Sequence, residues 1–163
     1  MKYLYENVIV CDIDGVLLDV SKLYKILEEL PEDERLEYFN ENANNSNYVS
    51  KNKVMFDMLN ALNRAGFKII LMTARARKIG PETYTFLSLG KVCLDNIAML
   101  ITRNSKMEGV PPHELKKQAI EELQTMADIK LIIDDDLDNC NMFEQMGYKV
   151  MRVMDKDNPN KII

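Results

Sequence analysis

Two aspartates separated by one residue, Asp12 and Asp14, directly follow the apolar segment 8–11. In a strand, residues two apart point to the same side, so both carboxylates would project from the strand's carboxyl end. Such a pair resists ionisation unless a cation lies nearby, and Mg²⁺ prefers carboxylate oxygens as ligands. A turn or a helix cap is the structural alternative for an isolated pair of this kind. The pair is therefore a candidate metal and catalytic site.

A second acidic cluster favours the metal interpretation. Asp134, Asp135 and Asp136 directly follow the apolar segment 129–133, and Asp138 lies close behind. Asp136 or Asp138 can cap a helix, but three consecutive acids at a strand end repel one another unless a cation offsets their charge. The sequence therefore predicts one Mg²⁺ site formed by Asp12, Asp14, Asp134 and Asp135. Asp136 or Asp138 could join this site.

A candidate phosphate site follows the apolar segment 68–72. The Thr73 hydroxyl, backbone N–H groups around Ala74 and the Arg75 guanidinium can all bind phosphoryl oxygens. A lysine from a helix beginning at Pro112 could neutralise both the phosphate and an attacking carboxylate. Either Lys116 or Lys117 could supply this charge.

The elements that must position these residues alternate along the chain. Apolar runs of strand length without polar alternation are typical of parallel strands buried on both faces; they lie at 8–11, 68–72, 98–101, 129–133 and 149–153. Helical patterns separate them: one capped by Ser50 and ended by Gly66, two opened by Pro81 and Pro112, and one over 137–146. This alternation predicts an α/β fold, a three-layer α/β/α Rossmann-like parallel sheet of about five strands.

One segment interrupts the alternation. Residues 19–49 are charged and helix-prone, and they end in the polar run 40–47. We predict a single domain over 1–163, with 19–49 as a small cap-like helical insertion after the first strand and 40–47 as a flexible return loop.

Composition narrows the class of protein. The formal net charge is −5, from 21 Lys+Arg and 26 Asp+Glu, which argues against strong sequence-independent binding of nucleic acid but not against a local basic groove. Three cysteines without paired spacing suggest a reducing compartment, so we expect a cytoplasmic protein. No apolar stretch approaches the length of a membrane span, and we expect no membrane association.

The order of these motifs resembles that of the haloacid dehalogenase-like (HAD) superfamily of phosphatases. The resemblance rests on Asp12-Ile13-Asp14-Gly15-Val16, Thr73, the helical lysine and Asp134-Asp135. It implies that Asp12 is the nucleophile and forms an aspartyl-phosphate, and that Asp14 is the general acid and then the base. It also implies that Thr73 and the lysine bind phosphate, while Mg²⁺ is held by Asp12, the Asp14 main-chain carbonyl and Asp134 or Asp135.

A narrower resemblance links segments 71–75, 128–135 and 146–150 to the 3′-phosphatase domain of phage polynucleotide kinase. It places the phosphate-site lysine at Lys117 and a phosphate-contacting arginine at Arg75. No G-x-x-x-x-G-K-[ST] loop is present in the 163 residues, so we expect no kinase half within them.

Three hypotheses for function follow. The first is a phosphatase acting on a phosphorylated nucleotide or nucleic-acid end, with a basic groove built from Lys22, Lys25, Arg75, Arg77, Lys78 and Arg103. The second is a small-metabolite phosphatase with the same mechanism, in which Tyr24, Tyr38 and Tyr48 pack over a compact substrate. The third is a non-catalytic binding protein with this fold. Because the insertion is short, the site should be open, which suits a large substrate or requires a homo-oligomer partner to close it.

Overall fold

The structure, a computed structural model, describes residues 3–107 and 109–154. Its centre is a five-stranded sheet in the order β5-β4-β1-β6-β7, in which every neighbouring pair is parallel. The strands are β1 (Tyr5–Cys11), β4 (Lys68–Ala76), β5 (Met99–Arg103), β6 (Ala127–Asp134) and β7 (Val150–Arg152). The predicted parallel sheet is therefore confirmed, with the apolar runs inside its strands.

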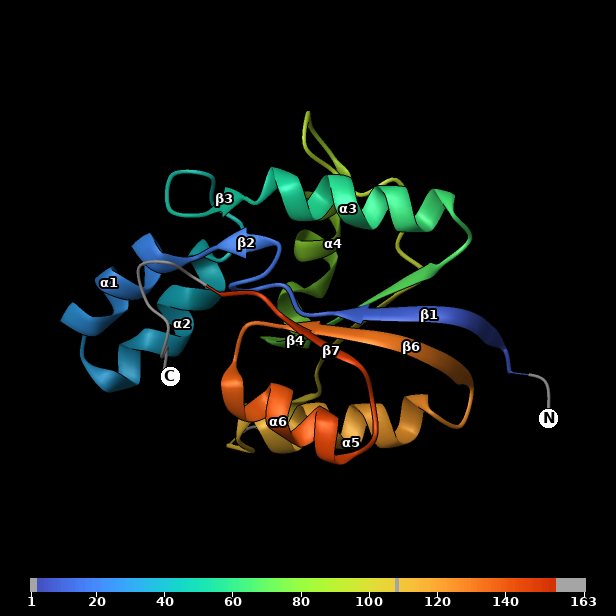
Figure 1. The fold of residues 1–163 in the computed structure, drawn as a ribbon. Coiled ribbons are helices and arrows are strands. Elements are labelled where there is room, and N and C mark those ends of the chain that lie inside the picture. The colour runs from blue at the N-terminus through green and yellow to red at the C-terminus, as the bar shows by residue number, and fades with distance from the viewer. Residues whose placement is uncertain (1–2, 108, 155–163) are drawn as a thin grey trace.

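Helices cover both faces of this sheet (Figure 1). One face packs against α3 (Lys53–Arg64) and α4 (Gly80–Ser88), and the other packs against α5 (Pro112–Leu123) and α6 (Leu137–Gln145). The short helices η1 (Arg77–Ile79) and η2 (Ser105–Met107) follow β4 and β5.

The alternation of side chains along β1 explains the three layers. Ile9 and Cys11 belong to the core cluster that includes Phe56 of α3, whereas Val8 and Val10 belong to the cluster that includes Phe143 of α6. Because successive residues of a strand point to opposite faces, a continuous apolar run fills two cores. The prediction of a three-layer α/β/α arrangement is thus confirmed.

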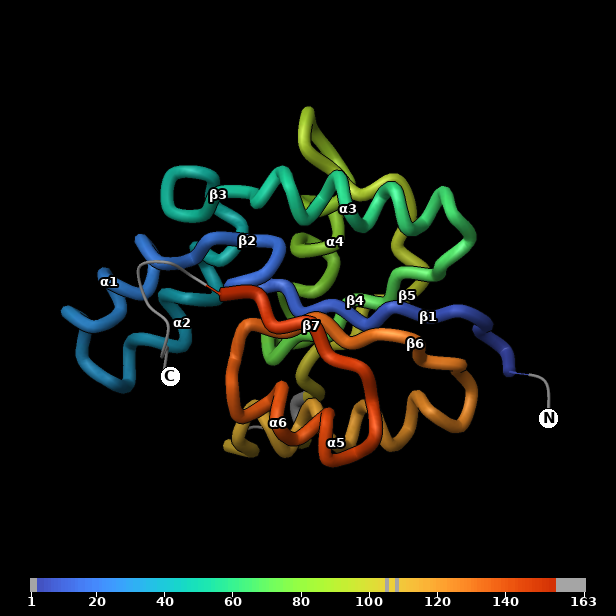
Figure 2. Tube along the Cα trace, viewed as in Figure 1, coloured from blue at the N-terminus to red at the C-terminus, as the bar shows by residue number. Residues whose placement is uncertain are grey.

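Between β1 and α3 the chain forms a small unit of two strands and two helices. Strands β2 (Leu18–Asp19) and β3 (Ser50–Lys51) pair antiparallel, and between them lie α1 (Ser21–Glu29) and α2 (Glu32–Asn42). The ribbon and the tube both place α1 and α2 beyond the carboxyl ends of the sheet strands (Figures 1 and 2). The insertion segment is therefore helical as predicted, and it lies at the edge of the sheet where the candidate site residues emerge.

Two local expectations were wrong. Ser50 lies in β3, and the cap of α3 is Asn52, whose side chain accepts a hydrogen bond from the Met55 N–H. The polar run 40–47 is not wholly a loop, because α2 continues through Asn42. Among the described residues, no helix is long and apolar enough to cross a membrane.

Candidate active site

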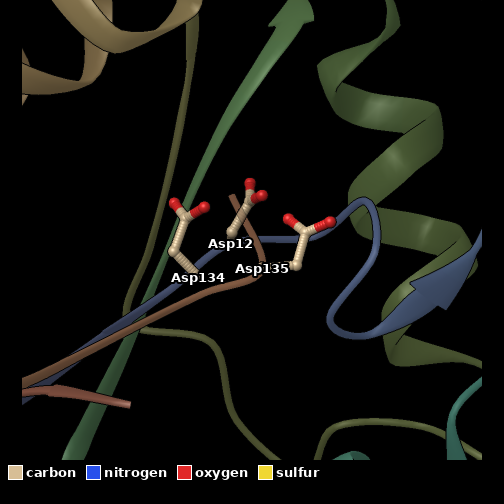
Figure 3. Close-up of side chains that lie close together, drawn as sticks. All are labelled: Asp12, Asp134 and Asp135. Carbon is tan, nitrogen blue, oxygen red and sulfur yellow. The ribbon is translucent and has the colours of Figure 1, made fainter. Parts of the chain in front are cut away.

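The sheet order brings the predicted site residues together. Strands β4 and β6 flank β1, and Cys11 pairs in register with both Leu71 and Ile133. The residues that follow these three positions therefore emerge side by side at the carboxyl edge, where open α/β sheets bind ligands. Figure 3 shows the carboxylates of Asp12, Asp134 and Asp135 pointing in the same direction.

Three of the four predicted metal-site carboxylates form one group. Asp12, Asp134 and Asp135 each offer a ligand atom, and these atoms lie within 4.8 Å of one another. Burial raises the pKa of Asp12 well above its ordinary value; Lys116 opposes this shift, and the neighbouring aspartates add to it. A compact, partly buried set of carboxylate oxygens is the donor chemistry that Mg²⁺ prefers, so these residues fit a hard divalent cation.

The lysine at the site is Lys116, not Lys117. Its ammonium lies 3.0 Å from Asp12 Oδ2 and 2.6 Å from Asp134 Oδ2, and the residue is buried, whereas Lys117 is exposed on α5. Burial by itself would lower the pKa of Lys116, but the two carboxylates outweigh burial and raise it. The sequence carried a signal for this choice, because Lys116 stands four and seven residues before the buried Ile120 and Leu123, at helical spacing.

Asp134 is fixed by a network that sequence reasoning missed. Asp134 Oδ2 accepts from Lys116, and Asp134 Oδ1 accepts hydrogen bonds from Asn139 Nδ2 at 3.1 Å and from the Asp136 backbone N–H at 3.1 Å. Asp136 is the cap of α6, since its Oδ1 accepts from the Asn139 N–H at 2.8 Å. Asp138 lies in the first turn of that helix. Asp136 is therefore a helix cap, as the sequence allowed, and Asp138 lies at the helix start. Neither residue belongs to the group formed by Asp12, Asp134 and Asp135.

Asp14 faces Arg75 rather than the other carboxylates. Arg75 Nε lies 3.0 Å from Asp14 Oδ2, and Arg75 Nη2 lies 2.7 Å from Asp14 Oδ1, a bidentate contact. The remaining guanidinium donors bind the side chains of Asn44 and Thr83 and the Ala43 carbonyl. All five donors of a guanidinium are thereby engaged.

In this structure Arg75 contacts Asp14, and the expected contact of Arg75 with a phosphate stays a prediction. The side chain is buried, and although burial alone would lower its pKa, Asp14 contributes most to raising it above the ordinary value. Arg75 therefore holds Asp14 in one orientation and joins it to the segment after α2 through Asn44. Asn44 and Thr83 gave no signal in the sequence, because only the tertiary fold brings them to this arginine.

The candidate phosphate residues lie at the same edge. Thr73 is buried, and its hydroxyl oxygen accepts from the Arg75 N–H at 3.2 Å, which leaves the hydroxyl hydrogen available to donate. Ala74 accepts a hydrogen bond from Arg103 Nε through its carbonyl at 3.1 Å. Thr73, Ala74 and Arg75 line the same cavity as Asp12 and Asp14.

The turn after β1 is shaped to admit Asp135. Gly15 has φ +84°, a conformation that residues with a side chain rarely adopt, and a Cβ at this position would collide with the Asp135 carboxylate. A glycine is thus required both for the turn and for the approach of Asp135 to Asp12.

A cavity of about 1050 Å³ lies over these residues. Asp12, Asp14, Thr73 and Lys116 contribute to its wall. Helices α1 and α2 contribute another part of the wall through Tyr24, Leu27, Leu36, Phe39 and Asn40. The cavity is therefore large enough for a substrate much bigger than phosphate itself.

The carboxyl edge of the sheet thus brings together three carboxylates and a buried lysine, with Asp14 held beside them by Arg75. The family model of the HAD superfamily, subfamily IIIB (acid phosphatase), matches residues 4–160. The match covers most of the chain, so the protein belongs to this family.

Solved structures share this fold. The chain resembles a component of the Pnkp1/Rnl/Hen1 RNA repair complex with a TM-score of 0.70 and 18% identity, over 91% of this chain and 42% of that one. It resembles the class C acid phosphatase from Bacillus anthracis with tungstate bound (TM-score 0.66, 17% identity, 91% of this chain, 66% of that one). It also resembles a HAD family enzyme from Bacteroides thetaiotaomicron in complex with magnesium and inorganic phosphate (TM-score 0.56, 12% identity, 90% and 93%).

The chain spans less than half the length of the RNA repair component that it resembles. No curated protein sequence matches it.

Proposed function

We propose that this protein is an Mg²⁺-dependent phosphomonoester hydrolase that works through an aspartyl-phosphate on Asp12, and that it acts on a nucleotide or nucleic-acid 3′-phosphate. The observation that carries the mechanism is the position of the Asp12 carboxylate. It lies 3.0 Å from a buried ammonium and within a group of two further carboxylates, at the wall of a cavity that Asp14 also lines.

In the first step, a carboxylate oxygen of Asp12 attacks the phosphorus, and the bond from phosphorus to the leaving oxygen breaks. Asp14 donates a proton to that oxygen, so the alcohol leaves neutral. Lys116 offsets the negative charge of Asp12, which would otherwise repel an anionic phosphate.

In the second step, Asp14 accepts a proton from water while the water oxygen attacks the phosphorus. The bond between phosphorus and Asp12 breaks, and inorganic phosphate and free Asp12 result. Arg75 has a positioning role here, because its bidentate contact fixes the carboxylate that must move the proton in both steps.

Asp12, with Asp134 or Asp135, would hold Mg²⁺, as would the main-chain carbonyl of Asp14. When bound, the ion supplies positive charge that stabilises the negative charge developing on the transferred phosphoryl group. Thr73, through its hydroxyl, and Ala74, through its backbone, are the proposed phosphate contacts.

Two features support a nucleotide or nucleic-acid substrate. The fold is similar to that of a component of an RNA repair complex, and the cavity is large enough for a nucleoside as well as its phosphate. The basic groove expected from sequence is only partly assembled on the cavity: Arg75, Arg77, Lys78 and Arg103 line it, whereas Lys22 and Lys25 do not. Among these four, Arg75 binds Asp14, and Lys78 pairs with Glu37 at 2.9 Å.

A small-metabolite phosphatase is the second candidate, because α1 and α2 give the cavity an apolar side suited to a compact substrate. Of the three tyrosines expected to pack over such a substrate, only Tyr24 lines the cavity. We propose that residues 19–49 act as a cap that determines whether the site accepts a nucleotide or a small metabolite.

Phosphate release from a panel of substrates separates the two candidates. The panel contains a 3′-phosphorylated oligonucleotide, nucleoside 3′- and 5′-monophosphates, a sugar phosphate and p-nitrophenyl phosphate, each with Mg²⁺ and with EDTA. The proposal predicts the highest kcat/KM for a 3′-phosphorylated nucleotide or oligonucleotide and no turnover with EDTA. A preference for the sugar phosphate would favour the second candidate, and undiminished turnover in EDTA would refute the role of Mg²⁺.

A further inference from the structure

The Arg75 nitrogen that does not contact Asp14 is held by two side chains from distant segments. Arg75 Nη1 donates to Asn44 Oδ1 at 2.7 Å and to Thr83 Oγ1 at 3.1 Å. Asn44 Nδ2 also donates to Thr83 Oγ1 at 3.2 Å, so a hydrogen bond joins each pair among the three side chains. A closed set of hydrogen bonds of this kind fixes the guanidinium in one position.

The two anchoring residues come from different parts of the fold. Asn44 follows α2, in the insertion between β1 and α3, whereas Thr83 lies in α4, which covers one face of the sheet (Figure 1). Thr83 is fully buried, and Arg75 is 2% exposed. Because a buried guanidinium that lost these acceptors would be left with unpaired N–H groups, both anchors are needed to hold Arg75 where it lies.

The anchors lie behind the reacting groups. Arg75 and Asp14 line the active-site cavity, whereas Asn44 and Thr83 do not contribute to its wall. Neither anchor is therefore placed to touch the phosphate or the leaving group. Their effect on the reaction must pass through Arg75, whose bidentate contact sets the direction of the Asp14 carboxylate. A small displacement of a group that transfers a proton slows the reaction strongly.

We infer that Asn44 and Thr83 are positioning residues for proton transfer by Asp14, and that they act through Arg75. This inference rests on the proposed phosphatase function. It separates two kinds of substrate: a leaving group that departs as an alcohol needs the proton from Asp14, whereas p-nitrophenolate is stable as an anion and needs none. The anchors should therefore matter for the first kind of substrate and not for the second.

The test compares Asn44→Ala and Thr83→Val with Asn47→Ala, a control at an exposed position of the same segment as Asn44. Each full-length protein is assayed with Mg²⁺ on a nucleoside 3′-monophosphate and on p-nitrophenyl phosphate. The comparison uses kcat/KM, because this ratio covers the steps through departure of the leaving group. It thus excludes the later hydrolysis of the aspartyl-phosphate, in which Asp14 also acts.

Asn44→Ala and Thr83→Val should each lower kcat/KM for the nucleotide by about 10-fold or more, and should lower it by less than about 2-fold for p-nitrophenyl phosphate. Thr83→Ser keeps the hydroxyl, so it should retain most of the activity on the nucleotide. The variant that combines Asn44→Ala with Thr83→Val should lose less than the product of the two single losses, because both changes release the same guanidinium. Asn47→Ala should match the wild type on both substrates.

Equal losses on the two substrates would overturn the inference while the phosphatase function stands, because a general loss of structure or of phosphate binding affects both. Wild-type activity of Asn44→Ala on the nucleotide would overturn it as well. If Asn44→Ala showed no thermal unfolding transition, Thr83→Val would decide by the same comparison. If the wild type released phosphate from neither compound, the proposed function and this inference would fall together.

Discussion

Replacement of Lys116 by methionine removes a positive charge that contacts both Asp12 and Asp134. The two contacts are 3.0 Å and 2.6 Å long, and each of the three side chains is at least nine-tenths buried. At an effective dielectric constant of about 20, each contact supplies about 5–6 kcal/mol of attraction, and desolvation of the buried ions takes back several kcal/mol per ion. Loss of one partner from a buried pair lowers stability by about 3–5 kcal/mol, because uncompensated charge remains.

We therefore expect the free energy of unfolding of Lys116→Met to fall by about 3–5 kcal/mol near neutral pH. Urea unfolding followed by circular dichroism measures this directly in EDTA. Lys117→Met is the matched control, since Lys117 is exposed and its replacement should change stability by no more than about 0.5 kcal/mol. Equal stability of the two variants would refute the assignment of the buried lysine, and so would a larger loss in Lys117→Met.

Two other perturbations probe the acidic cluster. Gly15→Ala forces a Cβ against the Asp135 carboxylate, whereas Gly66 has a similar positive φ but open space around it. Gly15→Ala should therefore lower the free energy of unfolding by about 1–3 kcal/mol more than Gly66→Ala does. Thermal unfolding of both variants measures this difference. Burial raises the pKa of Asp12, so the ionised carboxylate destabilises the fold above that raised pKa. In EDTA, Asp12→Asn should therefore have a higher melting temperature than the wild type at high pH. This difference in melting temperature should shrink as the pH falls through the raised pKa of Asp12. A difference that does not change with pH would contradict this reasoning.

The parallel sheet was predictable because its strands are buried on both faces. Ile9 and Cys11 enter one core and Val8 and Val10 enter the other, so β1 carries the continuous apolar run that is typical of a central parallel strand. The two-residue strands β2 and β3 were not predictable, because so short a pair leaves no periodic pattern.

The site was predictable where it depended on strand ends and not where it depended on packing between distant segments. Asp12 and Asp134 follow apolar strands directly, so their convergence could be inferred. The partners of Arg75 could not, because Asn44 and Thr83 are 31 and 8 residues away from it and reach it only through the fold. A free arginine beside a phosphate and an arginine engaged with Asp14 have the same local sequence.

Lys116 shows a case in which the helical pattern of the sequence was sufficient. Resemblance of motifs favoured Lys117, whereas the apolar periodicity of α5 places Lys116 on the buried face with Ile120 and Leu123. Helix register determines which side chain of α5 points toward the sheet. Here the register selects Lys116, although the resemblance of motifs points to Lys117.

In the proposed mechanism, Asp12 attacks the phosphorus. The rate of phosphate release from the best substrate of the panel, measured with Mg²⁺ for the wild type and for Asp12→Asn, tests this claim most directly. We expect the rate of Asp12→Asn to be at least about 10³-fold lower, because an amide cannot replace the attacking carboxylate. A folded Asp12→Asn protein that released phosphate at the wild-type rate would contradict the claim.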